Sequence, residues 1–198
     1  MIRTILFDAD GVLVTTGRKF SDHLAQDLNI SLEMTAPFYN GPFKECLIGK
    51  ADLKEEITPF LKGWGWDGSV DEFLSLWFKV EHQLDRPLLN YIQTLREKGI
   101  RCYVATNQEK YRSEYMKEYM GFGPLFDGVF ASNEIGVCKP SAEFYTYILD
   151  NVGTNADEVL FWDDTERNVI AAKEIGIDAE LYVSYDAFLA SMKQKLNI

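Results

Sequence analysis

The chain has 198 residues, enough to bury a full hydrophobic core, and its 46% hydrophobic and 26% charged residues exclude a largely disordered chain. Its 20 basic and 31 acidic residues give a net charge of −11, which disfavours binding to nucleic acid or to an anionic membrane. No apolar run approaches the roughly 20 residues that span a bilayer, and no signal peptide precedes the first apolar segment, so we expect a cytoplasmic protein.

The first predicted element is a short apolar strand at residues 5–7, which ends in Asp8-Ala9-Asp10-Gly11. Alternate side chains of a strand share a face, so Asp8 and Asp10 project roughly together, while Gly11 allows a sharp turn behind them. Open α/β sheets bind ligands at the carboxyl ends of their strands, where paired like charges are costly unless a cation or a reaction uses them. These four residues indicate either a nucleophile beside an acid/base near Mg²⁺, or an Asp-rich turn.

Residues 15–85 carry several helix signals and no strong strand. Amphipathic spacing predicts helices at 20–28 and 52–61, and Ser69-Val70-Asp71-Glu72 has the pattern of a capping box for a helix through His82. We therefore predict a helical insertion at 15–85 that interrupts a core formed by residues 1–14 and 86–198.

From residue 86 onward, helix and strand signals alternate at short intervals. Helices are predicted at 88–98, 109–120, 140–150, 165–175 and 185–196, and strands at 100–105, 128–130, 159–162 and 180–183. Such alternation is typical of a parallel sheet covered by helices on both faces. The predicted fold is α/β, a Rossmann-like parallel sheet with a small helical unit inserted after its first strand.

Polar residues suited to phosphoryl chemistry follow the later strands. Thr106 offers a hydroxyl, and Asn107 with nearby backbone N–H groups is suited to cradle phosphate oxygens. Lys139 precedes a predicted helix and is placed to neutralise a carboxylate and a phosphate, and Asp163 and Asp164 are hard oxygen ligands of the kind Mg²⁺ prefers. Each alone has a structural explanation, such as a strand end, a solvated lysine or a helix cap. Together at one edge of a sheet they favour a catalytic site.

In this order, the motifs resemble those of the haloacid dehalogenase superfamily over nearly the whole chain. The matching residues are Asp8-Ala9-Asp10-Gly11-Val12-Leu13, Thr106-Asn107, Lys139-Pro140 and Phe161-Trp162-Asp163-Asp164, followed by Asn168. Within the superfamily the chain is similar to phosphatases with a helical cap after the first strand. Residues 43–56, with Leu47-Ile48-Gly49-Lys50, further resemble sugar-phosphate phosphatases and the phosphatase domain of soluble epoxide hydrolase.

The resemblance implies hydrolysis of a small phosphomonoester, such as a sugar phosphate, through an aspartyl-phosphate on Asp8. Asp10 would protonate the leaving alkoxide and then deprotonate the attacking water. Thr106 and Asn107 would hold phosphate oxygens, and Lys139 would pair with both the nucleophile and the phosphate.

The resemblance also implies a Mg²⁺ cofactor. Its ligands would be a carboxylate oxygen of Asp8, the backbone carbonyl of Asp10, and Asp163. Asp164 would lie in the outer shell and orient a metal-bound water or Lys139.

Other functions remain open on the same residues. A phosphomutase of the β-phosphoglucomutase type would use the same core, and a non-catalytic regulatory protein on this scaffold is a further alternative. Haloacid dehalogenation needs no leaving-group acid, so Asp10 argues against it. A signalling receiver domain has its acid pair early and its lysine late, whereas Asp163-Asp164 follows Lys139 here.

Substrate specificity is expected to reside in the cap. Lys19, Lys44 and Lys50 are candidates to reach a polar substrate, although solvated lysines on helices are the favoured explanation. The aromatic residues there are expected to pack the cap and not to line a pocket: Phe20, Phe38, Tyr39, Phe43, Trp64 and Trp66. His23 and His82 lack metal-ligand spacing, and the three cysteines, Cys46, Cys102 and Cys138, suit reduced, mostly buried positions. The expected partner is a small phosphorylated metabolite, bound by a monomer or a weak homodimer.

Overall fold

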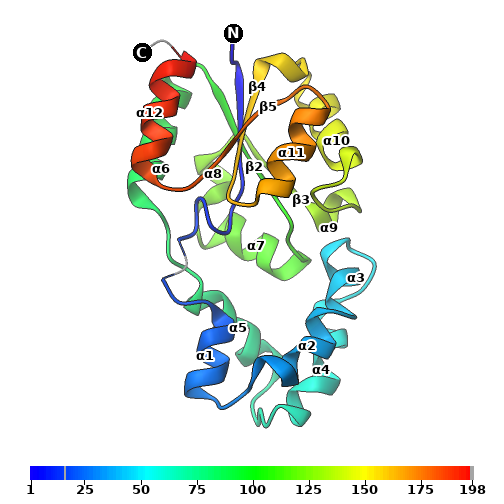
Figure 1. Cartoon of the computed structure of the whole chain (residues 1–198). Coiled ribbons are helices and arrows are strands. Elements are labelled where there is room, and N and C mark those ends of the chain that lie inside the picture. Colours follow the sequence, from blue (N-terminus) through cyan, green and yellow to red (C-terminus); the bar gives the residue numbers. More distant parts are fainter. Residues whose placement is uncertain (16, 197–198) are drawn as a thin grey trace.

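The computed structural model describes residues 1–15 and 17–196, and its centre is a five-stranded sheet of parallel neighbours in the order β3-β2-β1-β4-β5 (Figure 1). The predicted α/β fold class is confirmed. Residues 16 and 197–198, which fall within the predicted insertion and core, lie outside the described residues. The strands are β1 (Thr4–Phe7), β2 (Arg101–Thr106), β3 (Gly128–Ala131), β4 (Val159–Asp163) and β5 (Asp178–Leu181).

β1 occupies the middle of the sheet, where Thr4 pairs with Arg101 of β2 on one side and with Val159 of β4 on the other. Every residue of β1 is buried because helices cover both faces, as is usual for parallel sheets. The carboxyl ends of β1, β2 and β4 are therefore neighbours. This brings together the polar residues that follow these three strands.

The helices after residue 85 form two layers, one on each face of the sheet. Apolar side chains of α6, α7, α8 and α12 pack against one face, and those of α10 and α11 pack against the other. The bounds are α6 (Arg86–Glu97), α7 (Lys110–Glu118), α8 (Phe122–Leu125), α9 (Ser132–Ile135), α10 (Ala142–Val152), α11 (Glu166–Glu174) and α12 (Tyr185–Leu196), with a 3₁₀ turn at Ala156–Glu158.

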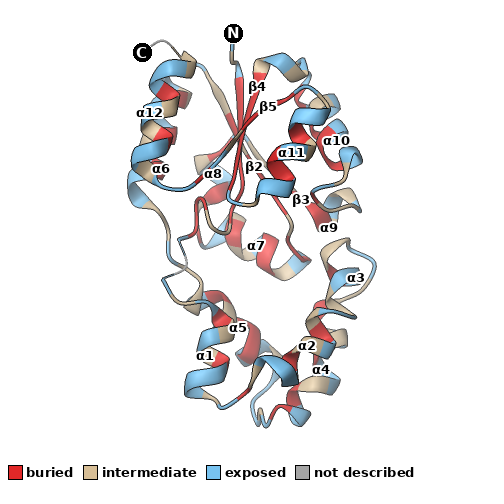
Figure 2. Ribbon diagram, in the orientation of Figure 1, coloured by how far each residue is buried: buried red, intermediate tan, exposed pale blue. Residues whose placement is uncertain are grey.

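Five helices between β1 and α6 form a separate cluster, here called the helical segment, below the sheet in Figure 1. They share an apolar core of their own, seen as the buried faces in Figure 2. Asp52 caps α4 by accepting the Lys54 N–H at 2.9 Å, and Ser69 with Glu72 forms the predicted capping box of α5. The bounds are α1 (Phe20–Asp27), α2 (Leu32–Tyr39), α3 (Phe43–Leu47), α4 (Leu53–Gly63) and α5 (Val70–Val80).

Two predicted elements are shifted by two residues at both ends. Helix α10 begins at Ala142, so Pro140 precedes it and does not lie in its first turn. Strand β5 covers 178–181 and not 180–183, because pairing with β4 places Asp178 opposite Leu160. In the part of the chain that is described, no helix combines the length and apolar character that crossing a bilayer requires.

The helical segment also contacts the sheet and the helices that cover it, residues 1–14 and 86–196, here called the sheet domain, at points away from the two connecting segments. The Ser132 hydroxyl donates to the Leu47 carbonyl at 2.6 Å, and the Tyr111 hydroxyl donates to Asp52 Oδ2 at 2.6 Å. Gly49 lies against the Asn133 carbonyl in a left-handed backbone conformation, with φ of 69°. These contacts hold the helical segment against the carboxyl edge of the sheet.

Candidate active site

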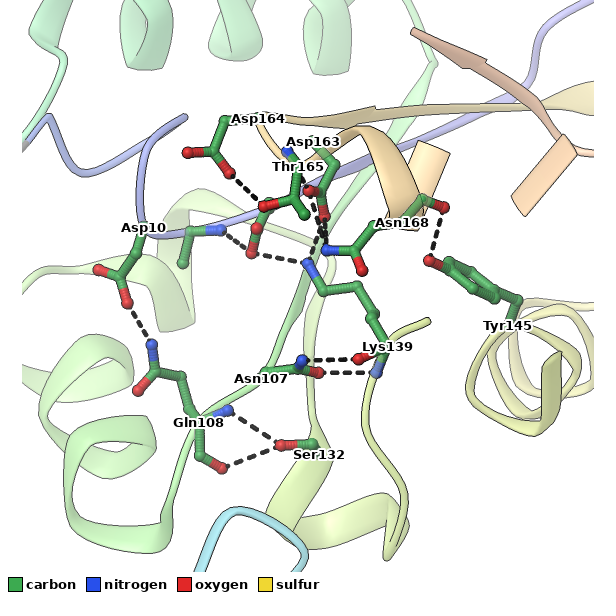
Figure 3. Close-up of polar contacts among 12 residues, drawn as sticks. Asp10, Asn107, Gln108, Ser132, Lys139, Tyr145, Asp163, Asp164, Thr165 and Asn168 are labelled. Atoms are coloured by element: carbon green, nitrogen blue, oxygen red, sulfur yellow. Dashed lines mark hydrogen bonds and ion pairs between the residues drawn. The ribbon is translucent and has the colours of Figure 1, made fainter. Parts of the chain in front are cut away.

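Asp8 follows β1 directly and is 8% exposed. Its Oδ1 accepts the Ala9 N–H at 2.7 Å and lies 2.8 Å from the Lys139 ammonium nitrogen. Lys139 also lies 2.6 Å from Asp163 Oδ2, so one buried cation joins carboxylates that follow or end two neighbouring strands (Figure 3). The structure therefore brings together the predicted nucleophile, lysine and first aspartate of the Asp163-Asp164 pair.

The charges of this cluster depend on one another. Burial raises the pKa of Asp8 to about 7, while Lys139 opposes that rise. Burial by itself would lower the pKa of Lys139, but Asp8 and Asp163 together hold that pKa above its ordinary value. Lys139 is consequently a charged ammonium shared by two carboxylates.

Asp163 and Asp164 are adjacent but differ sharply in their surroundings. The Asp163 carboxylate is fully buried and accepts from Lys139, from the Asn168 amide at 3.0 and 3.1 Å, and from the Thr165 N–H at 2.8 Å. The exposed Asp164 carboxylate accepts one hydroxyl, that of Thr165 at 3.2 Å. Nitrogen donors thus occupy Asp163, the predicted metal ligand, while Asp164, the predicted outer-shell residue, has the freer oxygens.

Three carboxylates meet the distance requirement for a shared cation. Ligand oxygens of Asp8, Asp163 and Asp164 all lie within 4.8 Å of one another. Hard carboxylate oxygens are the donors that Mg²⁺ prefers. A Mg²⁺ ion therefore fits the chemistry of this donor set.

Thr106 ends β2 and Asn107 follows it, both beside the cluster. Thr106 is the last residue of the strand and is buried. The Asn107 amide donates to the Lys139 carbonyl at 3.0 Å and accepts the Lys139 N–H at 2.8 Å. The Asn107 side chain therefore holds the backbone of Lys139 in place, a contact that the predicted phosphate role did not include.

Asp10 is held by two residues that sequence reasoning missed. Its Oδ1 lies 3.3 Å from Arg112 Nη2, and its Oδ2 accepts a hydrogen bond from the Gln108 amide. Gln108 follows the predicted Thr106-Asn107 motif by one residue, whereas Arg112 lies one helical turn further, on α7. Helical spacing alone gave no reason to link Arg112 to a residue about a hundred positions away.

A cavity of about 350 Å³ opens between the sheet domain and the helical segment. The sheet domain contributes Asp10, Gly11, Asn107, Gln108, Glu109, Arg112 and Asp164, and the helical segment contributes Lys19, Phe43, Leu47, Trp77 and Glu81. Lys19 thus reaches the cavity as one of the predicted lysines, whereas Lys44 and Lys50 are not among its lining residues. Phe43, expected only to pack, lines it as well.

The remaining candidate side chains serve packing or local pairing. His23 lies 2.7 Å from Asp27, and His82 Nδ1 lies 3.0 Å from the Tyr115 hydroxyl. The cysteines are unpaired, with Cys46 and Cys102 buried and Cys138 half-buried.

Comparisons with known proteins all find haloacid dehalogenase-like enzymes or phosphatases. A sequence profile described as haloacid dehalogenase-like hydrolase matches residues 2–176. Sesquiterpene phosphatase astK of Aspergillus oryzae is 36% identical over 93 residues, which is 47% of this chain and 47% of that protein. The chain therefore aligns to about half of that relative's length.

Two further proteins match along most of their length. The D-ribitol-5-phosphate phosphatase of Bacteroides thetaiotaomicron is 24% identical over 187 residues, covering 90% of each chain. A solved HAD family enzyme of the same organism, in complex with magnesium and inorganic phosphate, has a TM-score of 0.80 and 21% identity, covering 95% of this chain and 99% of the other. At this identity the structural likeness supports a shared fold.

Proposed function

Because the chain belongs to the haloacid dehalogenase-like hydrolase family, we propose that it is a magnesium-dependent phosphatase that hydrolyses a small phosphomonoester through Asp8. The observation that carries the proposal is the buried contact of Lys139 with Asp8 and Asp163 beside the half-exposed Asp10. A nucleophile, a fixed cation and a second carboxylate facing a cavity are the groups that phosphoryl transfer through a covalent intermediate requires.

In the first step a carboxylate oxygen of Asp8 forms a bond to phosphorus while the bond to the leaving oxygen breaks. The leaving oxygen keeps the electron pair and takes the proton of Asp10, which gives the free alcohol. Lys139 balances negative charge on Asp8 and on the phosphoryl oxygens. Asn107 supports this role by holding the Lys139 backbone.

In the second step water attacks the phosphorus of the aspartyl-phosphate. Asp10, now a carboxylate, takes a proton from that water, and the bond between phosphorus and the Asp8 oxygen breaks. Inorganic phosphate leaves, and the electron pair returns to the Asp8 carboxylate. Both active-site carboxylates are thereby restored to their starting states.

The residues that would hold Mg²⁺ are Asp8, Asp164 and the backbone carbonyl of Asp10. We favour Asp164 over Asp163 as the third ligand, because nitrogen donors occupy both oxygens of Asp163. When bound, the cation supplies positive charge that stabilises the transferring phosphoryl group. Asp163 would then act through Lys139. The magnesium and inorganic phosphate bound to the similar HAD family enzyme of Bacteroides thetaiotaomicron support Mg²⁺ as the cofactor.

A small phosphorylated metabolite is the proposed substrate, with the phosphate at Thr106 and Lys139 and the leaving group in the cavity. The cavity of about 350 Å³ suits such a molecule, and Phe43 and Trp77 give it an apolar wall. The phosphatase names of the two curated relatives favour this class. We expect the reaction to take place in the cytoplasm.

The test is phosphate release from a panel of phosphomonoesters, including sugar phosphates, nucleotides and isoprenoid phosphates, with and without Mg²⁺. We expect metal-dependent release that Asp8→Asn abolishes and that the exposed Asp150→Asn leaves intact. Absence of release from every member would overturn the proposal. Phosphate transfer between two substrate hydroxyls without release would indicate a phosphomutase instead.

A further inference from the structure

Arg112 is a buried cation that contacts carboxylates from two parts of the molecule. Its side chain is 3% exposed, and its Nη2 lies 3.3 Å from Asp10 Oδ1 and 3.6 Å from Glu81 Oε2. Its Nη1 donates to the Phe78 carbonyl at 3.3 Å. A guanidinium so placed is fixed in position, because moving it would leave a buried charge without a partner.

Glu81 is itself firmly held at the end of the helical segment. Its Oε2 accepts the Trp77 indole N–H at 2.9 Å, and its Oε1 accepts the Phe20 N–H at 3.1 Å. Glu81 therefore anchors the Arg112 guanidinium to the helical segment, and the same guanidinium nitrogen also contacts Asp10.

Asp10 is held from its other side as well. Gln108 donates to Oδ2, and the backbone of Gln108 is tied to the Ser132 hydroxyl at 3.0 Å. Asp10 nevertheless keeps 42% of its side chain exposed and lines the cavity. Both of its oxygens are thus oriented by protein donors while the carboxyl group faces the space for a substrate.

We propose that Arg112, anchored by Glu81, is a positioning residue that aims Asp10 at the leaving-group oxygen. The inference rests on the proposed phosphatase function and concerns the step in which the Asp10 proton reaches that oxygen. A proton donor must lie within hydrogen-bond reach of its acceptor, and a misplacement of about 1 Å can cost about a hundredfold in rate. Arg112 touches Asp10 and acts through it, with no bond to phosphorus.

This role makes the effect of Arg112 depend on the leaving group. A nitrophenolate departs without a proton, whereas an alkoxide needs one as it leaves. The ratio kcat/KM covers the steps up to departure of the alcohol, so the later attack of water does not enter it. Loss of Arg112 should therefore lower kcat/KM for an alkyl phosphate far more than for p-nitrophenyl phosphate.

The experiment measures kcat/KM for p-nitrophenyl phosphate and for the best alkyl phosphate of the panel, using the full chain with Mg²⁺. We compare the unaltered protein with Arg112→Met, Arg112→Lys and Lys117→Met, the last being a lysine on the same helix that pairs with Glu134. We expect the alkyl phosphate to lose at least about tenfold more than the aryl phosphate in Arg112→Met. Arg112→Lys should recover part of that loss, and Lys117→Met should change neither rate.

Both substrates are assayed on the same preparation, so partial unfolding of a variant lowers both rates equally and leaves their ratio unchanged. In an Asp10→Asn background, Arg112→Met should add no further change in that ratio. Equal losses for the two substrates in Arg112→Met would overturn the positioning role while leaving the phosphatase function intact. Hydrolysis of neither substrate by the unaltered protein would overturn the proposed function and this inference with it.

Discussion

The Lys139 ammonium nitrogen lies 2.8 Å from Asp8 Oδ1, and both side chains are almost fully buried. The same nitrogen lies 2.6 Å from Asp163 Oδ2. The Lys139 ammonium therefore offsets the repulsion between two buried carboxylates. Fold stability and the chemistry of the site therefore depend on the same residue.

Lys139→Met should destabilise the protein by about 3–5 kcal/mol, because it leaves buried carboxylates without their cation. Denaturant unfolding measures the change. Lys195→Met is the matched control, since Lys195 also pairs with two carboxylates, of Asp178 and Glu180, but at the surface, where we expect a loss of about 1 kcal/mol or less. Adding Asp163→Asn to Lys139→Met should restore part of the stability, and equal losses in the two lysine variants would contradict this explanation.

Gly11→Ala should weaken Mg²⁺ binding by about tenfold or more. Gly11 has φ of 89°, and a Cβ there would lie 2.0 Å from Asp164 Oδ2, so the carboxylate must move. Isothermal titration calorimetry with Mg²⁺ measures the affinity. Gly99→Ala introduces similar backbone strain, at φ of 83°, where a Cβ meets no atom within 4 Å. If both variants bound Mg²⁺ as the unaltered protein does, Asp164 would not be a ligand.

Glu109 should make stability fall as the pH rises through neutrality. Burial raises the pKa of Glu109 from 4.5 to about 7, against the opposing hydrogen bonds from the Tyr111 and Arg112 N–H groups. The folded state therefore binds this proton more tightly than the unfolded state. Its contribution is complete below about pH 4.5 and is lost as the pH rises through about 7, with a slope of at most about 1.4 kcal/mol per pH unit.

The measurement is the free energy of unfolding of the unaltered protein and of Glu109→Gln between pH 5 and pH 8. Other groups titrate in both proteins, so the difference between the two curves isolates Glu109. We expect the decline with pH to be shallower in Glu109→Gln. Parallel curves would show that the carboxyl group is ionised in the folded state throughout.

Gly49→Ala should loosen the contact between the helical segment and α9. A Cβ at this position would lie 2.3 Å from the Asn133 carbonyl oxygen, and φ of 69° is strained for alanine. Hydrogen exchange of α3 amides should become faster. Gly65→Ala is the control, because at φ of 80° it introduces backbone strain while its Cβ meets no atom within 4 Å. The same acceleration in both variants would assign the effect to backbone strain and not to the contact.

Much of the fold followed from local patterns. The alternation of helix and strand signals after residue 86 predicted the parallel sheet, and the capping box at Ser69 predicted the start of α5. Helices α2, α3, α8 and α9 were not predicted. The last three are four or five residues long, and α2 contains Pro37, so they offer too little periodicity to detect. The predicted division into core and cap remains a prediction.

Some residues of the candidate site were likewise expected from the sequence, and others were found only in the structure. Asp8, Lys139 and Asp163 were expected to meet, because each follows or ends a strand signal or precedes a helix at one edge of a parallel sheet. The family resemblance implied Asp163 as the metal ligand and Asp164 in the outer shell. It gave no sign that nitrogen donors surround Asp163 and leave Asp164 the more open carboxylate, since neighbouring residues of one type look alike in a sequence. Trp77 and Glu81 entered the site only through the placement of α5 over the sheet.

The sequence by itself determined the strands, the longer periodic helices and the edge at which the charged motifs gather, because strand and helix periods and capping residues act over a few positions. Tertiary structure alone decided that nitrogen donors occupy Asp163, that Asp164 faces Gly11, and that Arg112 links Asp10 to Glu81. Apart from the local bonds of Asp163 with Thr165 and Asn168, those contacts join residues tens of positions apart. Their geometry depends on how whole helices pack, which no local pattern records.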